Sequence, residues 1–391
     1  MAKPSPRGGG GAIRRAYDSG QSYHALRACL IQGSAGNESE LFGIMTTTMR
    51  YKFFASSYST WQAMFEAIEG AKESIYLEMY IFNDDMRRFD FLNLLKEKAK
   101  RGLRVRIVLD SFGSSELSKN AVTELKNSGA EVYFFSRFLH RIHRKILVVD
   151  EELAFIGGVN FHQVARRWDD LAVRVRGKLV LSIISSFARV YAECGGKDPR
   201  VLAQNKKFFL PKTRTWLIEN FPISKSFVLK KIYKKNISKA EESIIFITPY
   251  FMPKHWLIGA LHQAVLRGVR VEVLVPKKSN HFLPDRIAYF FMFKLSKLGV
   301  NFFLLPRMNH AKAMIIDRSE AILGSHNLDF LSFELNSEVG IFFKNKKAVE
   351  ELKEIMEGWK KGAVLFDHGA FKPTFFDYIF FPVIRLFFRI I

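Results

Sequence analysis

The sequence predicts an α/β fold made of two copies of one unit, and three pairs of matched segments support this prediction. The pairs are Ser74–Phe82 with Ser243–Phe251, Arg101–Asp110 with Arg267–Pro276, and His143–Asn160 with His310–Asn327. They occur in the same order in both halves of the chain. Three ordered matches at a nearly constant spacing are typical of an internal duplication.

In the first copy, short β-rich runs alternate with helical patterns. Tyr76–Phe82 is predicted as a strand and Phe89–Gly102 as an amphipathic helix, because its apolar residues recur at helical spacing. Val105–Asp110 is the next predicted strand, followed by a helix over Ala121–Gly129 and a strand over Val132–Phe135.

The second copy repeats this alternation, with a predicted helix over His255–Gly268, a strand over Val269–Pro276 and a helix around Phe290–Gly299. Nearly continuous apolar strands separated by helices indicate a sheet covered on both faces. We therefore expect two duplicated α/β sandwich domains related by a pseudo-two-fold axis, with an active site at their interface.

The predicted organisation has five parts. Residues 204–239 read as a linker because they are rich in Lys and contain Pro211 and Pro222, although 227–239 has a helical pattern. The parts are a flexible basic leader over 1–50, a first domain over 51–203, the linker over 204–239, a second domain over 240–362 and an amphipathic tail over 363–391.

The composition narrows the class of partner. The 391 residues include 60 Lys and Arg against 38 Asp and Glu, a net charge of +22, together with 38 Phe. This combination favours an anionic lipid surface or a nucleic acid as partner. Two cysteines make no disulfide framework, no Cys/His cluster predicts a metal, and no apolar run is long enough to span a bilayer.

An H-x-K pattern occurs once in each copy, as His143 with Lys145 and as His310 with Lys312. Residues two apart on a strand share a face, so each imidazole and its ammonium group project together. Asp150 and Asp317 complete the motif in sequence, and we include them in the candidate catalytic set. Their odd spacing predicts that they anchor the strand end rather than contact substrate.

Two such motifs brought together could perform phosphoryl chemistry. One imidazole can attack phosphorus while the other protonates the departing alkoxide. Lysine and amide donors suit the phosphate oxygens, and a protonated Lys cannot ligate a metal. The candidate phosphate-binding residues are Asn160, Asn327 and Ser325, the last alternatively a turn residue; Asp170 and Glu338 are candidate acceptors that orient the imidazoles.

H-x-K-x4-D followed by G-[GS]-x-N, present twice, resembles the phospholipase D superfamily from about Ser59 to Trp359. Within it the sequence is most similar to bacterial cardiolipin synthases, in a short form without two amino-terminal membrane helices. The residues that carry this similarity are Gly36-Asn37-Glu38, Asp84 and Asp85, Gly157–Asn160, Thr248–Pro253 and Ser332–Glu338. Trp168-Asp169-Asp170 stands where Trp-Arg-Asp is common.

The resemblance implies a cofactor-independent transfer between two phosphatidylglycerol molecules, giving cardiolipin and glycerol through a phosphohistidine. It favours His143 as nucleophile and His310 as acid and base. It also implies a peripheral protein of the bacterial cytoplasmic membrane.

Thr374–Ile391 fits a helix lying in the membrane interface, or alternatively one packed on the core. The alternatives in function are another phospholipase D-type hydrolase or phosphatidyltransferase, and a nuclease, although no nucleic-acid partner is expected. The acceptor alcohol and the oligomeric state stay open.

Overall fold

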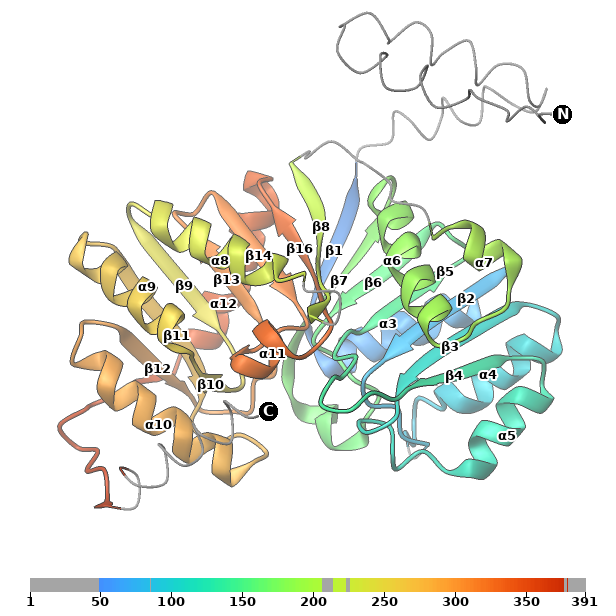
Figure 1. The fold of residues 1–391 in the computed structure, drawn as a ribbon, viewed down its shortest axis with the longest axis horizontal. Coiled ribbons are helices and arrows are strands. Elements are labelled where there is room, and N and C mark those ends of the chain that lie inside the picture. The colour runs from blue at the N-terminus through green and yellow to red at the C-terminus, as the bar shows by residue number, and fades with distance from the viewer. Residues whose placement is uncertain (1–48, 85, 206–213, 223–225, 376–377, 379–391) are drawn as a thin grey trace, which may run out of the picture. The chain divides into compact units, whose positions relative to one another are not determined.

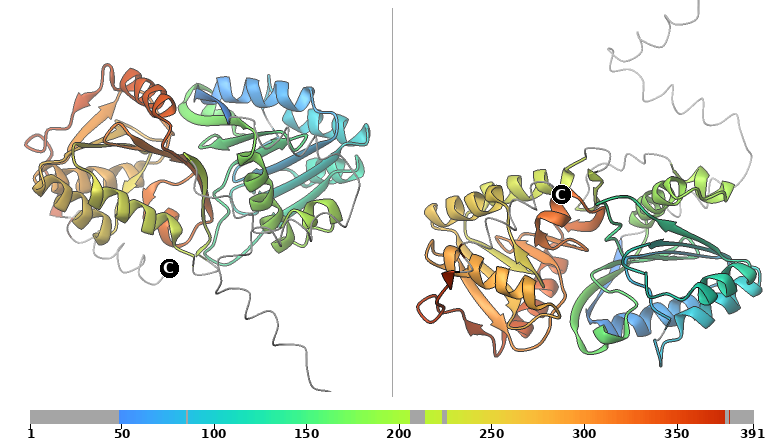
Figure 2. Two further views of the ribbon diagram at one scale, coloured as in Figure 1. Left: turned by 90° about the horizontal axis from the view of Figure 1, so that it is seen from above. Right: turned by 60° about the horizontal axis from the view of Figure 1, so that its bottom comes forward.

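The structure is a computed structural model that describes residues 49–84, 86–205, 214–222, 226–375 and 378. Over this range the chain forms two mixed sheets with helices on both faces (Figures 1 and 2). The first sheet has the strand order β1-β7-β6-β5-β2-β3-β4, and the second has β17-β12-β11-β9-β13-β14-β16-β8. The second order repeats the first strand by strand and adds β17, so the predicted duplicated α/β fold is confirmed.

The first half is built from seven strands and their covering helices. The strands are β1 Arg50–Ser56, β2 Ser74–Met79, β3 Arg104–Asp110, β4 Glu131–Phe135, β5 Ile146–Val149, β6 Leu153–Gly157 and β7 Asp169–Arg176. The helices are α3 Ser57–Glu69, α4 Phe91–Lys100, α5 Lys119–Asn127, the 3-10 helix η1 Gln163–Arg167, α6 Leu179–Glu193 and α7 Pro199–Ala203.

The second half follows the same plan. Its sheet contains β8 Thr215–Asn220, β9 Ser243–Ile247, β11 Arg270–Pro276, β12 Asn301–Leu305, β13 Ala313–Ile316, β14 Glu320–Gly324, β16 Glu338–Phe343 and β17 Val364–Leu365, and β10 Phe251–Met252 pairs separately with β15 Leu328–Asp329. The helices are α8 Val228–Lys239, α9 His255–Leu266, α10 Phe282–Ser296, α11 Phe330–Glu334 and α12 Lys346–Lys360.

Strand direction places both H-x-K motifs at equivalent edges. The strands β2, β3 and β4 run parallel, whereas β5 is antiparallel to β2. The start of β5, just after His143 and Lys145, therefore lies at the carboxyl end of β2. The second sheet repeats this arrangement with β9, β11 and β13. We call this side of each sheet the motif edge.

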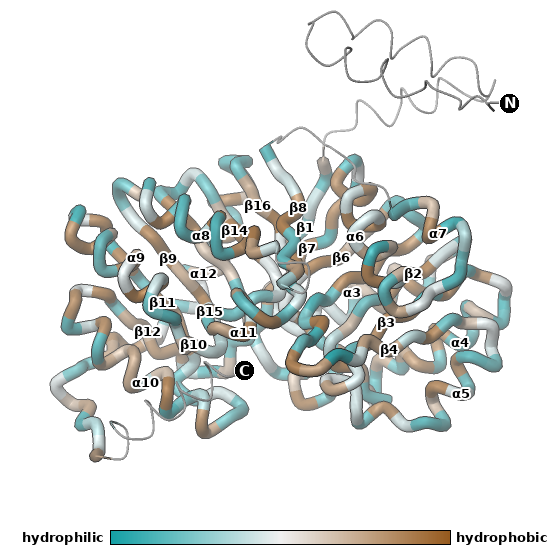
Figure 3. Tube along the Cα trace, in the orientation of Figure 1, coloured by the Kyte–Doolittle hydropathy of each residue, from teal (hydrophilic) through white to brown (hydrophobic). Residues whose placement is uncertain are grey.

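Side chains alternate in direction along each strand, so apolar residues pack in one layer on each face of the sheet. On β2, Ile75 and Leu77 pack under α3 and α4, whereas Tyr76 faces α6. The apolar cluster around α6 continues without interruption into the face of the second sheet beneath α12. Figure 3 shows the corresponding hydrophobic strands between more polar helix surfaces. The two halves therefore share this one buried cluster, whereas each has a further cluster of its own on the other face of its sheet.

The predicted linker over 204–239 is wrong as a boundary. Thr215–Asn220 forms the edge strand β8, which pairs antiparallel with β16 from Thr215–Phe343 to Asn220–Glu338. The ring of Trp216 stacks on Phe342 at 4.1 Å. The helix expected over 227–239 is present as α8. The strand β8 and the helix α8 therefore belong to the second half, and α8 carries Lys230, Lys231, Lys234, Lys235 and Lys239.

The beginning of the predicted tail also belongs to the folded body. Val364–Leu365 pairs with β12, and Phe366 is buried in the core of the second half. Phe371 packs against Tyr289 and Phe293 of α10. Residues 376–377 and 379–391 lie outside the described residues. None of the helices in the described ranges has the length and hydrophobicity needed to cross a bilayer.

Asp150 and Asp317 anchor matching turns at the edge opposite the motif edge. Asp150 accepts hydrogen bonds from the backbone N–H groups of Lys72, Glu73 and Ser74. Asp317 accepts the equivalent three from Glu241, Glu242 and Ser243. Both aspartates have positive φ, 51° and 47°. Each carboxylate thus joins the turn after one strand to the start of its neighbour.

Replacing Asp150 by Ala should lower the free energy of unfolding by about 1–3 kcal/mol, because three N–H groups lose their acceptor. Urea denaturation would measure this. Glu152→Ala is the control, since its side chain is 74% exposed and makes only a surface pair with Arg176. The control should change stability by less than about 0.5 kcal/mol. Equal effects of the two substitutions would contradict the anchoring role.

A buried ion pair lies behind the first motif. Arg144 points away from its neighbours His143 and Lys145 into the core, where its Nε lies 2.8 Å from Glu78 Oε1. Neither side chain has any exposed surface. Arg144 also donates to Ser186 Oγ at 2.6 Å. Burial raises the pKa of Glu78 to about 7 despite the opposing effect of Arg144.

Arg144→Met should destabilise the protein by about 3–5 kcal/mol, because it leaves the Glu78 carboxyl buried without its partner. Adding Glu78→Gln should recover part of this loss, since the uncompensated acid is removed. Thermal unfolding of the single and double variants gives the coupling. A double variant as unstable as the sum of the two single ones would show that the pair contributes nothing as a pair.

Candidate active site

The two H-x-K motifs have the same local geometry. His143 and Lys145 directly precede β5, and His310 and Lys312 directly precede β13, so strand alternation turns each pair to one face. Lys145 Nζ donates to the carbonyl oxygen of His143, and Lys312 Nζ does the same to His310. The residues His143 and His310 are only 8% and 5% exposed. Each motif is therefore held in a fixed, buried conformation.

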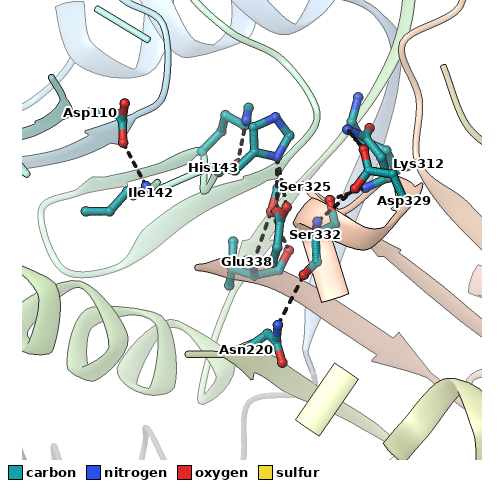
Figure 4. A network of polar contacts seen from close by, with 12 residues as sticks. Asp110, Ile142, His143, Asn220, Lys312, Ser325, Asp329, Ser332 and Glu338 are labelled. Atoms are coloured by element: carbon teal, nitrogen blue, oxygen red, sulfur yellow. Dashed lines mark hydrogen bonds and ion pairs between the residues drawn. The ribbon is translucent and has the colours of Figure 1, made fainter. Parts of the chain in front are cut away.

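Each imidazole is paired with a carboxylate from the other half. His143 Nδ1 lies 3.0 Å from Glu338 Oε1, and His310 Nδ1 lies 2.9 Å from Asp170 Oδ2. Figure 4 shows Glu338 between His143 and Ser325. A carboxylate accepts from Nδ1–H, which fixes the tautomer and leaves Nε2 unprotonated for chemistry. The sequence predicts both acids as orienting groups, and the structure crosses them between the copies.

Backbone hydrogen bonds hold the crossed pairs in register. The N–H of His143 donates to the carbonyl of Ser337 at 3.0 Å, immediately before Glu338. The N–H of His310 donates to the carbonyl of Asp169 at 2.7 Å, immediately before Asp170. The two sets of contacts are reciprocal, as a two-fold relation between the halves requires. Neither half contains a complete set of site residues.

Burial and neighbouring lysines keep both imidazoles neutral in the free protein. Burial, then the charges of Lys145 and Lys312, hold the pKa of His143 well below its usual range. Burial and Lys312 lower the pKa of His310 to about 4, although Asp170 opposes this. Burial also lowers the pKa of Lys145 to about 7 and that of Lys312 to about 8. A bound anion would restore the charge of these groups.

The two carboxylates, Asp170 and Glu338, differ in the direction of their pKa shifts. Burial favours the neutral form of Asp170, but His310, Lys312 and the Leu171 N–H together hold its pKa below the usual value. Burial raises the pKa of Glu338, and Lys145 only partly offsets this. His310 therefore has the more firmly anionic partner.

Ser325 has a different contact from the predicted one. Its hydroxyl donates to Glu338 Oε2 and accepts from the N–H of Val339. In the described structure the hydroxyl is therefore used within the protein, where it orients Glu338. Gly158 takes this place in the first copy, where an added Cβ would lie 2.3 Å from Asp170 Oδ1.

The two predicted amides lie beside the motifs. Asn160 Oδ1 accepts from the N–H of Ile81 at 3.2 Å, which uses the carbonyl end of this amide. Asn327 Nδ2 lies 3.3 Å from Asp329 Oδ2. Asp329 is a buried acid that the sequence analysis did not identify, and burial raises its pKa to about 6. Its only sequence signal is its position two residues after Asn327.

Aromatic rings also contact the imidazoles and were not predicted. Tyr80 meets His143 edge-on at 4.8 Å between ring centroids, and Tyr250 lies 6.4 Å from His310. Trp168 lies 5.6 Å from His310. Both tyrosines follow the repeated strands β2 and β9 closely, which is the signal that could have identified them. Asp150 and Asp317, in contrast, lie at the opposite edge, so their inclusion in the catalytic set is corrected.

Comparisons with known proteins identify the family of the chain. The sequence model of the family described as "Cardiolipin synthase, PLD-like domain" matches residues 64–191 and 233–359. A cardiolipin synthase of Listeria welshimeri is 30% identical over 334 residues, which are 80% of this chain and 69% of that protein. The probable cardiolipin synthase YwiE of Bacillus subtilis is 28% identical over 335 residues, with 80% and 66% covered. The chain spans about two thirds of the length of these relatives.

Two solved structures share the fold. Phosphatidylserine synthase of Haemophilus influenzae has a TM-score of 0.68 at 14% identity, with 83% of this chain and 89% of that one covered. Polyphosphate kinase of Porphyromonas gingivalis has a TM-score of 0.55 at 12% identity, with 79% and 46% covered. With the family match over both copies, these findings place the chain in the cardiolipin synthase family of phospholipase D-like phosphatidyltransferases.

Proposed function

We propose that this protein is a cardiolipin synthase that transfers a phosphatidyl group from one phosphatidylglycerol to another and releases glycerol. The observation that carries the proposal is the pair of crossed imidazole–carboxylate contacts, His143 with Glu338 and His310 with Asp170. They provide two buried imidazoles whose Nε2 atoms can share one phosphodiester. One reaction step needs a nucleophile and the other a proton donor and acceptor.

In the first step, Nε2 of His143 attacks phosphorus and the bond from phosphorus to the glycerol oxygen breaks. His310, protonated in the substrate complex, gives its proton to that oxygen, so neutral glycerol leaves. A phosphatidyl-histidine remains. In the second step, neutral His310 takes the proton from a hydroxyl of a second phosphatidylglycerol. That oxygen attacks phosphorus, the P–N bond breaks, and cardiolipin forms.

The difference between the two carboxylates supports these roles. A nucleophile must be neutral, and His143, whose pKa is held well below its usual range by burial, is neutral in the free protein. A general acid must carry a proton during the reaction, and the anionic partner Asp170 favours the charged form of His310. The phosphodiester anion adds to this effect on His310.

The remaining residues provide donors for the phosphate. Lys145 and Lys312 lie beside the imidazoles, and a bound phosphodiester raises their pKa from about 7 and about 8, so both become ammonium donors. The amides of Asn160 and Asn327 are the other proposed phosphate donors. The proposed substrate and the net charge of +22 fit a peripheral protein at an anionic bacterial membrane.

The test of this function is to supply vesicles of phosphatidylglycerol and to quantify glycerol, cardiolipin and phosphatidic acid together. We expect cardiolipin and glycerol in equal amounts. Phosphatidic acid as the main product would indicate a hydrolase and overturn the proposal. A single-stranded or duplex DNA substrate in a parallel assay covers the nuclease alternative, for which we expect no cleavage.

His143→Ala and His310→Ala should each lower turnover by at least about 10³-fold, because each removes one of two groups that act as a unit. With a phosphatidyl substrate that carries an activated leaving group, His310→Ala should accumulate a covalent phosphatidyl-enzyme, detectable by mass spectrometry on His143. The control is His262→Ala on α9, which should retain activity. Labelling of His310 in the His143→Ala variant instead would reverse the two roles.

The pH dependence of kcat distinguishes the roles of the two carboxylates. Asp170→Asn removes the charge that raises the pKa of His310, so the alkaline limb of kcat should move to lower pH. Glu338→Gln should lower kcat at every pH without moving that limb, because it acts on the neutral nucleophile. The measurement is glycerol release over a pH series. A shift of the limb in Glu338→Gln alone would contradict the assignment.

A further inference from the structure

Three large aromatic side chains are exposed at the motif edge, apart from the buried site residues. Phe138 is 88% exposed on the loop after β4, Phe112 is 63% exposed on the loop after β3, and Phe282 is 85% exposed where α10 follows β11. All three positions follow the carboxyl ends of parallel strands, which lie at the edge that carries His143 and His310. Exposed apolar side chains that gather at one edge and are rimmed by polar residues are typical of a contact with another protein or a membrane.

Two chains of contacts connect these loops to the imidazoles. The N–H groups of Phe112 and Gly113 donate to Asp110, whose other carboxylate oxygen accepts from Ile142, next to His143. In the second half, Tyr250 faces His310, and its hydroxyl donates to Asn280, two residues before Phe282. Phe112 and Phe282 therefore stand beside the site rather than on an unrelated surface.

Basic side chains accompany these phenylalanines. The guanidinium of Arg141 lies 4.6 Å from the ring centre of Phe112, and Arg137 precedes Phe138. Lys277 and Lys278 are exposed beside Phe282. The segments 136–141 and 277–283 contain no Asp or Glu, and 111–118 contains only Glu116. We call these three segments the rim loops.

The positive charge is unevenly distributed between the two edges. The connecting segments at the motif edge contain 13 Lys and Arg against 6 Asp and Glu; Arg144, Lys145, Lys312 and Asp329 among them are buried, which leaves 10 against 5. Those at the opposite edge contain 7 against 7. The motif-edge segments are 80–90, 111–118, 136–145, 158–168, 248–254, 277–281, 306–312 and 325–337, and the opposite ones are 70–73, 101–103, 128–130, 150–152, 177–178, 240–242, 267–269, 297–300, 317–319 and 344–345.

We propose that the rim loops are the membrane-docking surface, with Phe112, Phe138 and Phe282 inserted among the lipids of an anionic bilayer and the flanking Arg and Lys on its headgroups. The occupant is a bilayer because apolar rings with cations around them match the acyl region and the anionic headgroup layer together. This inference rests on the proposed function, since a phosphatidyl substrate would then enter directly from the membrane to the buried imidazoles.

Insertion is tested by Phe138→Trp and Phe282→Trp in the full chain, each compared with the parent protein. The vesicles contain equal parts of phosphatidylglycerol and phosphatidylcholine, with or without brominated acyl chains. We expect the added tryptophan emission to shift to the blue and to be quenched by bromine. Leu266→Trp is the matched control, because Leu266 is 65% exposed at the end of α9, at the opposite edge, and should show neither change.

Affinity is tested by the double variant Phe138→Ser/Phe282→Ser in vesicle sedimentation. We expect binding to weaken by about tenfold or more, because two phenyl groups no longer leave water. Leu266→Ser should bind like the parent protein. Sedimentation that is unchanged in the double variant, or tryptophans that stay unquenched on sedimented vesicles, would overturn the docking surface and assign binding to another part of the chain, such as the tail.

The docking surface and the synthase activity can be rejected independently of each other. Insertion needs no turnover, so quenched tryptophans without cardiolipin formation would retain the docking surface and reject the synthase. Cardiolipin formation with unquenched tryptophans would retain the synthase and reject the docking surface. Weakened sedimentation with vesicles of phosphatidylcholine alone would support the charge argument, whereas equal binding to both kinds of vesicle would contradict it.

Discussion

The hydrogen bonds that cross between the halves are the constraint on which the rest of the structure depends. Glu338 and Asp170 are buried, and each finds its histidine only in the other copy. A buried carboxylate without a partner is strongly unfavourable, so the two sheets must meet at their motif edges. The shared apolar cluster between α6 and α12 and the backbone contacts beside each histidine fix the same arrangement. Catalytic geometry and the packing of the halves are therefore one feature.

The duplication is not fully symmetric, and the differences lie where they affect chemistry. Glu338 has a serine hydroxyl beside it, whereas the shorter Asp170 lies against Gly158, where a side chain would clash. Behind the motif, the first copy buries the Glu78–Arg144 pair. The equivalent positions in the second copy are the apolar Ile247 and Ala311. A nucleophile and a general acid need different protonation behaviour. Two imidazoles with different surroundings therefore suit a division into these two roles.

The sequence predicted the local features well because periodicity and repetition are local signals. The strands, the faces of His143 and His310 and the anchoring geometry of Asp150 follow from alternation and spacing. Pairing across the molecule does not, so the crossing of Asp170 and Glu338 required the structure. The strand β8 was hidden in a Lys-rich segment, because its partner β16 lies more than a hundred residues away. The contact of Ser325 with Glu338 could not be predicted from the sequence, because a small polar residue near a phosphate site can serve either the ligand or its neighbours.

The net charge of +22 alone does not distinguish a lipid from a nucleic acid, but its distribution is informative. A protein that follows a polyanion needs a basic groove along its length, and it gains little from exposed phenylalanines unless bases stack on them. Among the connecting segments at the two edges, an excess of Lys and Arg is found only at the motif edge, while the opposite edge is balanced. The three exposed rings stand on that same charged edge, on loops from both halves. In the proposed reaction a phosphodiester reaches the buried imidazoles at this edge, and the proposed docking surface around them combines apolar rings with cations, as a contact with an anionic bilayer requires.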